Sequence, residues 1–318
     1  MTANLFTLEA LIFSLLFSVA AFILGTVVGL VNAEKGRAPL RGMEAAFLAL
    51  GGAWLARVFV GLLLMSAGGS AGAGMAVGWG LFLWPGAVDT VLKIFGAGPV
   101  LTTSEALLWF ATAVGSFAGM MDGLWRIHHW RGPGALTFLM DMTWGLAGTT
   151  NGCLFHLFNF AWAGHADEPR HGAHRYRSGF RFKKNFAVTQ GSVMSGMRTD
   201  HGEHAPGSSL YRHETVHVLQ NRVFGPFFTL TYLGWMAVLL LPSLIAGAAS
   251  RLASIGDTLQ WWCYYDNPWE VWAYQVGGSR SNPSAFLCWS VPVAVVLGAV
   301  FALLALGLTV LVVVSVWG

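Results

Sequence analysis

The chain has 318 residues, of which 55% are hydrophobic and only 10% are charged, and its mean hydropathy is +0.59. Soluble domains carry about 25% charged residues, so this composition excludes an ordinary soluble protein and indicates a membrane protein whose first partner is a lipid bilayer. The net charge of +3 gives no reason to expect a nucleic-acid partner.

The first predicted elements are apolar segments long enough to cross about 30 Å of hydrocarbon. Residues 8–31 have no basic stretch before them and are too long for a signal-peptide core, so they predict a retained transmembrane helix. Further strong segments lie at 43–65, 104–124 and 285–317, and weaker ones lie at 75–95 and 136–162. Together with a hairpin that dips into the membrane, described below, these segments predict an all-α polytopic membrane protein with about six to eight membrane segments, some re-entrant.

The polar residues gather in one small insert, residues 165–222, which holds nine of the 18 Lys and Arg residues and seven of the ten His residues. Residues 180–183 and 186–189 alternate apolar and polar side chains and predict a short two-stranded β unit. Because basic loops mark the cytoplasmic side of a membrane, the insert is expected at the cytoplasmic face. The predicted parts are an N-terminal transmembrane bundle (1–164), a core with the insert and a metal-binding helix (165–283), and a C-terminal transmembrane helix (284–318).

A His-Glu-x-x-His motif lies near the end of this insert. His213 and His217 are four residues apart, so on a helix both imidazoles reach one ion. Glu214 stands beside that ion and is suited to accept a proton from an activated water, as a general base. A turn with a capping Ser at 206–209 and Gly225-Pro226 predict the two ends of this helix. The motif predicts one Zn²⁺ per chain.

A third ligand is needed, and Glu270 is the best candidate. Asn267 can cap a helix and Pro268 suits its first position, which puts Glu270 in the first turn. The alternative is that Glu270 is only the capping-box partner of Asn267. Acidic residues are scarce after the motif, since only Asp257 and Asp266 accompany Glu270, and this scarcity favours the ligand role.

These motifs together resemble the gluzincin zinc metallopeptidases. His-Glu-x-x-His followed by Gln220, Gly225-Pro226 and Asn267-Pro268-x-Glu270 is similar to poorly characterised bacterial membrane proteins, over about residues 185–275. The resemblance implies that His213, His217 and Glu270 bind zinc, that Glu214 is the general base, and that the substrate is a peptide or membrane protein. It also implies an integral protein of the bacterial inner membrane. The separation of His217 from Glu270 is longer than in many gluzincins.

The apolar residues 227–249 constrain this assignment. If they crossed the bilayer, His217 and Glu270 would lie on opposite faces, because the polar stretch 251–266 is not suited to return through lipid. Either residues 227–249 dip into the membrane and return with a break at Pro242, or Glu270 is not the ligand. We expect the re-entrant hairpin, and a pair of short interfacial helices is equally acceptable.

Other residues are candidates for orienting a ligand or stabilising the transition state. Gln220 shares the helix face of both histidines, although a plain polar residue is an equal alternative. A tyrosine hydroxyl can donate to an oxyanion, but the alternative is a tyrosine that only lies at the membrane interface. A histidine in the loop before the motif can bind the charge of the transition state, but the alternative is a solvated loop histidine. Asp141, Asn151 and His156 line a substrate cavity or form a structural network. The candidates for orienting a ligand or stabilising the transition state are Gln220, Asn267, Tyr264, Tyr265, Tyr274, His201 and His204.

Two other functions remain open. The first is a membrane di-iron oxidoreductase, because several histidine pairs loosely resemble the histidine boxes of di-iron desaturases. The second is a non-catalytic membrane scaffold with a structural metal site, although such sites are usually closed by four ligands and rich in Cys, and no Cys lies near the motif. The histidine pairs are His128-His129, His171 with His174, His201 with His204, and His213 with His217.

Overall fold

The computed structural model describes residues 5–130, 132–159, 164–166, 168, 170–250, 253–278 and 296. This part of the chain is mostly helical with a few short strands, in agreement with the predicted all-α class. Among the described residues, four helices are long and apolar enough to cross a membrane: α1 (Leu8–Val31), α2 (Ala38–Ser66), α5 (Ser104–Trp125) and α9 (Pro226–Ala249). The predicted number of about six to eight membrane segments is therefore not confirmed, and the predicted segment 285–317 lies outside the described residues.

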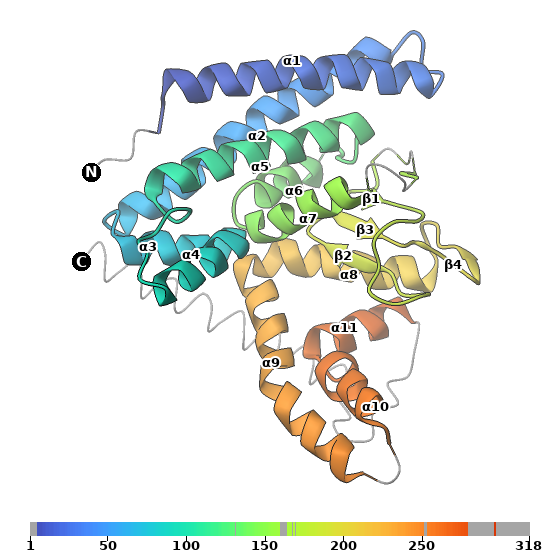
Figure 1. The fold of residues 1–318 in the computed structure, drawn as a ribbon. Coiled ribbons are helices and arrows are strands. Elements are labelled where there is room, and N and C mark those ends of the chain that lie inside the picture. Colours follow the sequence, from blue (N-terminus) through green and yellow to red (C-terminus); the bar gives the residue numbers. More distant parts are fainter. Residues whose placement is uncertain are drawn as a thin grey trace.

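Helices α1, α2 and α5 pack together as a bundle (Figure 1). A Cβ atom on Gly52 of α2 would lie 2.3 Å from the carbonyl oxygen of Gly115 of α5, and one on Gly115 would lie 2.2 Å from the carbonyl oxygen of Gly52. Small residues allow helices in a membrane to approach this closely. Only 17% of the apolar stretch of α1 is buried inside the protein, so most of the surface of this helix is available to lipid.

The two weaker segments fold as short packed helices and not as single spanning ones. The first breaks at Leu83, whose φ of 61° ends one helix and begins the next. Asp89 in this segment is buried, and its carboxylate accepts hydrogen bonds from the backbone N–H groups of residues 100–102. Polar side chains here bond within the protein. The elements are α3 (Ala71–Val77), the π-helix η1 (Gly78–Phe82), α4 (Trp84–Ile94), α6 (Pro133–Asp141) and α7 (Leu146–Asn159).

The insert forms a small sheet, but the predicted pairing of 180–183 with 186–189 is wrong. Only the end of the second segment becomes a strand, β2, which pairs antiparallel with β3 across Gly191. Gly191 has a φ of 57°, which suits a tight turn, whereas Phe182 is 80% exposed and offers no buried face for a strand. The strands are β1 (His174–Arg175), β2 (Val188–Gln190), β3 (Val193–Ser195), β4 (Arg198–Thr199) and β5 (Gly202–Glu203), in sheets β1-β3-β2 and β4-β5.

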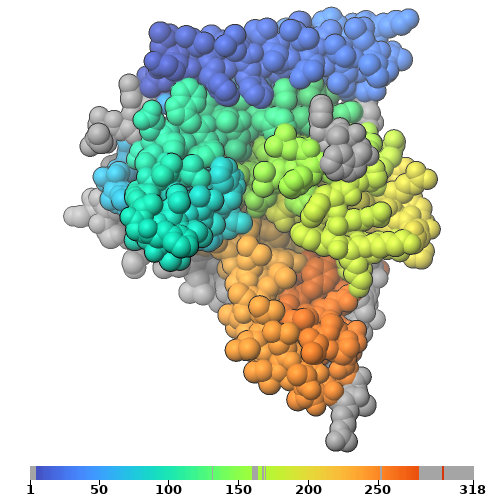
Figure 2. Space-filling model, in the orientation of Figure 1, coloured from blue at the N-terminus to red at the C-terminus, as the bar shows by residue number. Residues whose placement is uncertain are grey.

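The motif helix α8 (Ser209–Phe224) has the predicted ends. Ser208 caps it by accepting a hydrogen bond from the backbone N–H of Tyr211, and Gly225 ends it. Helix α9 then leaves the body of the molecule and runs crosswise to α1 and α5 (Figure 1). In Figure 2 its far end projects from the body together with the short helix α10 (Ile255–Leu259).

The predicted break at Pro242 is wrong, because α9 continues through this residue to Ala249. The Ser243 hydroxyl donates to the carbonyl of Leu240, so a side chain satisfies one backbone group near the proline. The chain returns instead through α10 and the π-helix η2 (Gln260–Tyr265), which pack along α9, and through α11 (Pro268–Gly277), which packs against α8. Glu270 therefore reaches the motif although α9 is unbroken.

Candidate metal centre

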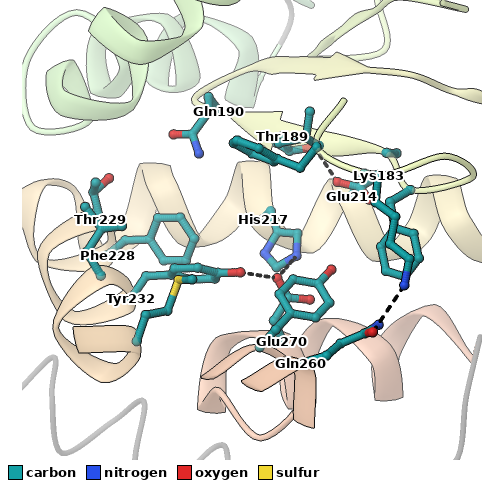
Figure 3. A pocket seen from close by; sticks show the side chains of 17 residues that line it. Lys183, Thr189, Gln190, Glu214, His217, Phe228, Thr229, Tyr232, Gln260 and Glu270 are labelled. Atoms are coloured by element: carbon teal, nitrogen blue, oxygen red, sulfur yellow. Dashed lines mark hydrogen bonds and ion pairs between the residues drawn. The ribbon is translucent and has the colours of Figure 1, made fainter. Parts of the chain in front are cut away.

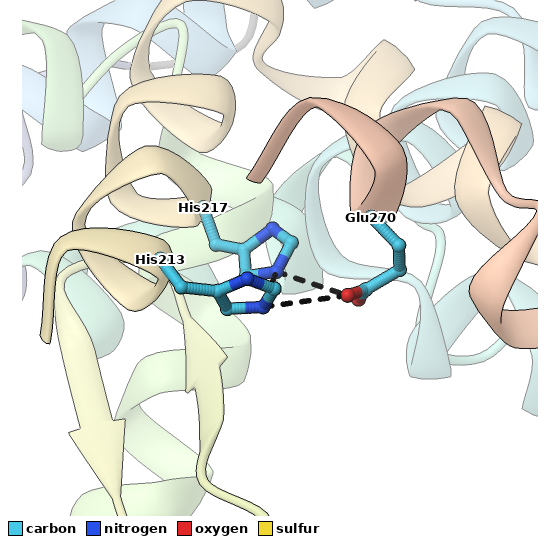
Figure 4. A group of neighbouring side chains, drawn as sticks. All are labelled: His213, His217 and Glu270. Carbon is cyan, nitrogen blue, oxygen red and sulfur yellow. Dashed lines mark hydrogen bonds and ion pairs between the residues drawn. The ribbon is translucent and has the colours of Figure 1, made fainter. Parts of the chain in front are cut away.

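Two helices bring the three predicted ligands together. His213 and His217 lie one turn apart on α8, and Glu270 lies in the first turn of α11 behind its cap Asn267. The helices approach closely at Gly277, where a Cβ atom would lie 3.0 Å from the Cβ atom of His213. The three ligand side chains are buried and point toward one another (Figure 4).

The nitrogen and oxygen atoms of the three side chains lie at separations that suit a tetrahedral metal ion. Nε2 of His213 and Nε2 of His217 are 3.1 Å apart. Nε2 of His213 lies 3.4 Å from Oε2 of Glu270, and Nε2 of His217 lies 3.4 Å from the other carboxylate oxygen, Oε1. Metal–ligand bonds of about 2.0 Å at tetrahedral angles separate the ligand atoms by about 3.3 Å. All three observed separations are close to this value.

The hydrogen bonds of Glu270 also fit a cation. The hydroxyl of Tyr232 donates to Oε1 at 2.7 Å, whereas Oε2 is buried and has no hydrogen-bond partner among the described residues. A buried carboxylate oxygen without a donor is costly, and a metal ion would satisfy it. Two imidazoles and one carboxylate are a donor set of catalytic zinc sites, so these residues fit a zinc ion.

Gln220 orients one of the ligands. Its side-chain Nε2 donates to the carbonyl of Trp269 at 3.1 Å, which fixes the amide so that Oε1 faces Nδ1 of His217 at 2.8 Å. Because an amide oxygen only accepts, Nδ1 of His217 carries the hydrogen and Nε2 is left to bind a metal. Gln220 is fully buried, so the alternative of an exposed polar residue is wrong. Asn267 is buried too, and it caps α11 and donates to the carbonyl of Tyr232.

The ligands perturb one another electrostatically. Burial lowers the pKa of His217, but the Glu270 carboxylate outweighs burial and raises that pKa to about 9. Burial raises the pKa of Glu270, but the two imidazoles outweigh it and hold that pKa below its usual range. Without a metal, the group therefore holds a protonated imidazole beside a carboxylate, and a bound metal ion would take the place of the proton.

A pocket of about 520 Å³ adjoins the ligands (Figure 3). Glu214, His217 and Glu270 lie on its wall, together with β2, one face of α9 and residues of η2. The hydroxyl of Thr189 on β2 donates to Oε2 of Glu214 at 2.6 Å, which holds the carboxylate at the pocket. Thr189 and Tyr232 were not predicted, because each reaches its partner only through tertiary packing.

The tyrosines near Glu270 have different positions. Tyr264 lines the pocket, and its hydroxyl lies 3.4 Å from the hydroxyl of Tyr274. Tyr274 packs on the ring of His213 with ring centres 4.4 Å apart and does not line the pocket. Tyr265 is buried and accepts a hydrogen bond from Gln260, so it is not placed to meet substrate. Burial, and then the charge of Glu270, raise the pKa of Tyr264, which therefore remains a hydroxyl donor.

The loop histidines are not part of the centre. Among the described residues, the only group with metal-ligand geometry is His213, His217 and Glu270. His201 is exposed in the turn between β4 and β5, and the ring of His204 is hydrogen-bonded to the Thr199 hydroxyl at 2.8 Å.

The three residues predicted to line a substrate cavity do not line the pocket. Asp141 forms a buried ion pair with Arg222 of α8, with an Oδ2–Nη2 distance of 2.7 Å, and thereby anchors the end of the motif helix. The ring of His156 is hydrogen-bonded to the hydroxyl of Tyr176 at 2.8 Å. Asn151 is not among the residues that line the pocket.

A second buried histidine group was not predicted. Asp122 of α5 accepts hydrogen bonds from His128 and from His174 of β1, both at 2.9 Å. The other nitrogen of His174 lies 3.0 Å from His165, whose second nitrogen in turn faces the carbonyl of Ala166 at 2.8 Å. Two members of the predicted histidine boxes, His128 and His174, are therefore engaged in a hydrogen-bonded network. No local spacing indicates it, because its members lie far apart in the sequence.

Comparison with protein-family models, curated proteins and solved structures finds no match to this chain. The function of the protein is therefore inferred from the motif residues and from the geometry of the site.

Proposed function

We propose that the protein is a membrane-embedded zinc-dependent hydrolase, most simply a peptidase of gluzincin type. The observation that carries this proposal is the buried group of His213, His217 and Glu270, of which His217 and Glu270 line one pocket together with Glu214. Three protein ligands leave the fourth position of a tetrahedral zinc free, as catalytic sites do and as closed structural sites do not. Bound zinc lowers the pKa of a water ligand and polarises a carbonyl group.

The chain's own residues supply the remaining chemistry. Glu214 accepts the proton of the attacking water and later gives it to the leaving amine. Thr189 keeps the Glu214 carboxylate in place, and the hydroxyl of Tyr264 donates to the negative oxygen of the tetrahedral intermediate. The strand β2 is at the edge of its sheet and lines the pocket, so an extended peptide can pair with its backbone.

The membrane arrangement is part of the same proposal. Helix α9 runs crosswise to α1 and α5, so it does not cross the bilayer parallel to them. We infer that the hairpin of α9 with α10 and η2 enters the membrane without spanning it alongside the bundle, and that residues 285–317 add a further span. The site then lies near the surface of a bacterial inner membrane, at its cytoplasmic face, as the basic insert predicts.

The competing functions receive less support from the geometry. A di-iron centre needs ligands from more than one histidine box, but His174 is bonded to Asp122 and His204 to Thr199. A structural site in a scaffold gives no role to Glu214 and its Thr189 partner beside a large pocket.

The test is hydrolysis of a quenched-fluorescent peptide library by the full chain in detergent, compared with Glu214→Gln. The variant removes the base but keeps the size of the side chain and one acceptor oxygen. We expect it to retain zinc and to lose about 10²- to 10⁴-fold in kcat. Equal rates for both proteins, or no hydrolysis by the zinc-loaded wild type, would contradict the proposal.

A further inference from the structure

The pocket has two rims of different chemistry. On one rim, Phe182 and Lys183 are exposed, and the Lys183 ammonium group donates to Oε1 of Gln260 at 3.1 Å (Figure 3). The same ammonium group lies 5.1 Å from the ring centre of Phe186. On the other rim, Leu233 of α9 lines the pocket and is 44% exposed. The pocket is therefore open both to a polar surface and to an apolar one.

The apolar rim continues into the outer surface of α9. The pocket-lining residues of this helix have the spacing of one helix face, over more than two turns. The rest of α9 is apolar and exposed, and only 11% of its apolar stretch is buried inside the protein. The pocket-lining residues are Phe228, Thr229, Tyr232, Leu233 and Met236, and exposed ones beyond the pocket include Val238, Leu240, Leu241 and Ile245.

We propose that the substrate is a polypeptide with a membrane-embedded apolar segment, which enters past Leu233 from the lipid and is cleaved next to a bulky apolar side chain. This inference rests on the proposed hydrolase function. A segment in lipid meets an apolar path from the outside of α9 to the ligands, so it loses little solvation on the way.

The walls of the pocket explain the preferred side chain. Apart from the metal-site residues, the lining is mainly aromatic and aliphatic, and Lys183 is its one other charged residue. Burying a large apolar side chain there is favourable because it removes apolar surface from water, whereas a buried charge would lack a partner. Lys183 on the opposite rim suits the region of anionic lipid headgroups, where the polar part of such a substrate would leave the bilayer.

The test uses the full chain in vesicles of phosphatidylcholine and phosphatidylglycerol. Quenched-fluorescent peptides carry Ala, Asp, Lys, Leu or Phe at one central position, and each peptide is made free and with an N-terminal palmitoyl chain. We expect Leu and Phe peptides to be cleaved about tenfold faster than the Ala peptide. Palmitoylated peptides should be cleaved faster than free ones at equal total concentration.

Two variants of α9 locate the path of entry. Leu233→Lys puts a charge on the apolar rim and should lower the ratio of palmitoylated to free cleavage rates by about tenfold. Leu241→Lys puts the same charge on the same helix at a residue that is 64% exposed and does not line the pocket, so it should leave that ratio unchanged.

The outcomes separate the two proposals. If free and palmitoylated peptides are cleaved equally, or if both variants change the ratio equally, entry from the lipid is wrong while the hydrolase stands. Equal rates for Leu, Asp and Lys peptides would contradict the apolar side-chain preference. If the zinc-loaded protein cleaves none of the peptides, the proposed function is wrong, and this inference with it.

Discussion

Two buried groups in this protein are built from the same residue types and differ in their hydrogen bonds. In the Asp122 group, each carboxylate oxygen accepts a hydrogen bond from one imidazole. The chain of hydrogen bonds continues from His174 through His165 to a backbone carbonyl. In the metal centre, two imidazole nitrogens face each other at 3.1 Å, and one oxygen of Glu270 has no donor. The first group is complete within the protein, and we propose that a cation completes the second.

The comparison shows what distinguishes a ligand set from a cluster of histidines. Histidine and carboxylate can satisfy each other when donors and acceptors alternate, and such a network stabilises a fold. Acceptors that converge on one point repel one another unless a proton or a metal lies among them. Substitutions in the two groups should therefore differ in whether they change the stability of the fold or the binding of zinc.

Asp122→Ala should destabilise the protein without affecting the metal. The substitution leaves His128 and His174 buried without their shared acceptor, which costs about 3–5 kcal/mol. Thermal unfolding in detergent should show a clearly lower Tm, with zinc content unchanged. Loss of zinc at unchanged Tm would mean that the Asp122 group, too, binds metal.

Gln220→Leu should weaken zinc binding about 10- to 100-fold, because His217 loses the acceptor that fixes its ring. Titration against a zinc chelator measures this change. Leucine preserves most of the buried volume, and Gln190→Leu, on the pocket wall, is a matched amide control that should bind zinc as the wild type does. Unchanged affinity in Gln220→Leu would assign Gln220 to packing alone.

Metal-free and zinc-loaded protein should respond differently to pH. The pKa of His217 in the metal-free fold is raised from 6.5 to about 9, so a proton binds the folded state more tightly than the unfolded one. This stabilisation is fully present below about pH 6.5 and is lost as the pH rises through about 9. Zinc competes with the same proton, so its stabilisation grows over that window.

The measurement is the Tm between about pH 6 and about pH 9, with a chelator and with zinc. We expect the chelated protein to lose stability as the pH rises and the zinc-loaded protein to keep it, so that the gap between the two Tm values widens. Parallel curves would contradict the displacement of a proton by the metal.

Thr189→Val should have the smallest effect. It keeps the shape of the side chain and removes the hydrogen bond to Glu214, worth about 1 kcal/mol. We expect kcat to fall about fivefold with KM and zinc content nearly unchanged. Thr189→Ser, which restores a hydroxyl, should recover most of the rate, and equal loss in both variants would assign the effect to packing.

Local sequence patterns predicted those parts of the site that lie within one element. Helix α8 begins after Ser208 and ends at Gly225 because capping and glycine chemistry act over a few residues. Asn267 and Pro268 likewise begin the helix that carries Glu270. The prediction that Glu270 lies close to the motif is confirmed, although the predicted reason for it, a break at Pro242, is wrong.

The remaining features depend on packing between distant segments. The sequence gives Asp122 and His174 no common pattern, and their bond spans 52 residues. Tyr232 reaches Glu270 only because η2 returns along α9 and α11 then packs against α8. The predicted strand at 180–183 was wrong because its alternation of apolar and polar residues has no buried face, which only the fold reveals.

The most direct test of the metal centre is metal content by mass spectrometry on the detergent-purified full chain, with Glu270→Ala and Asp122→Asn as matched variants. Both remove a buried carboxylate that faces two imidazoles. We predict about one zinc per chain in the wild type and in Asp122→Asn, and little or none in Glu270→Ala. Zinc retained in Glu270→Ala, or absent or replaced by iron in the wild type, would contradict the account.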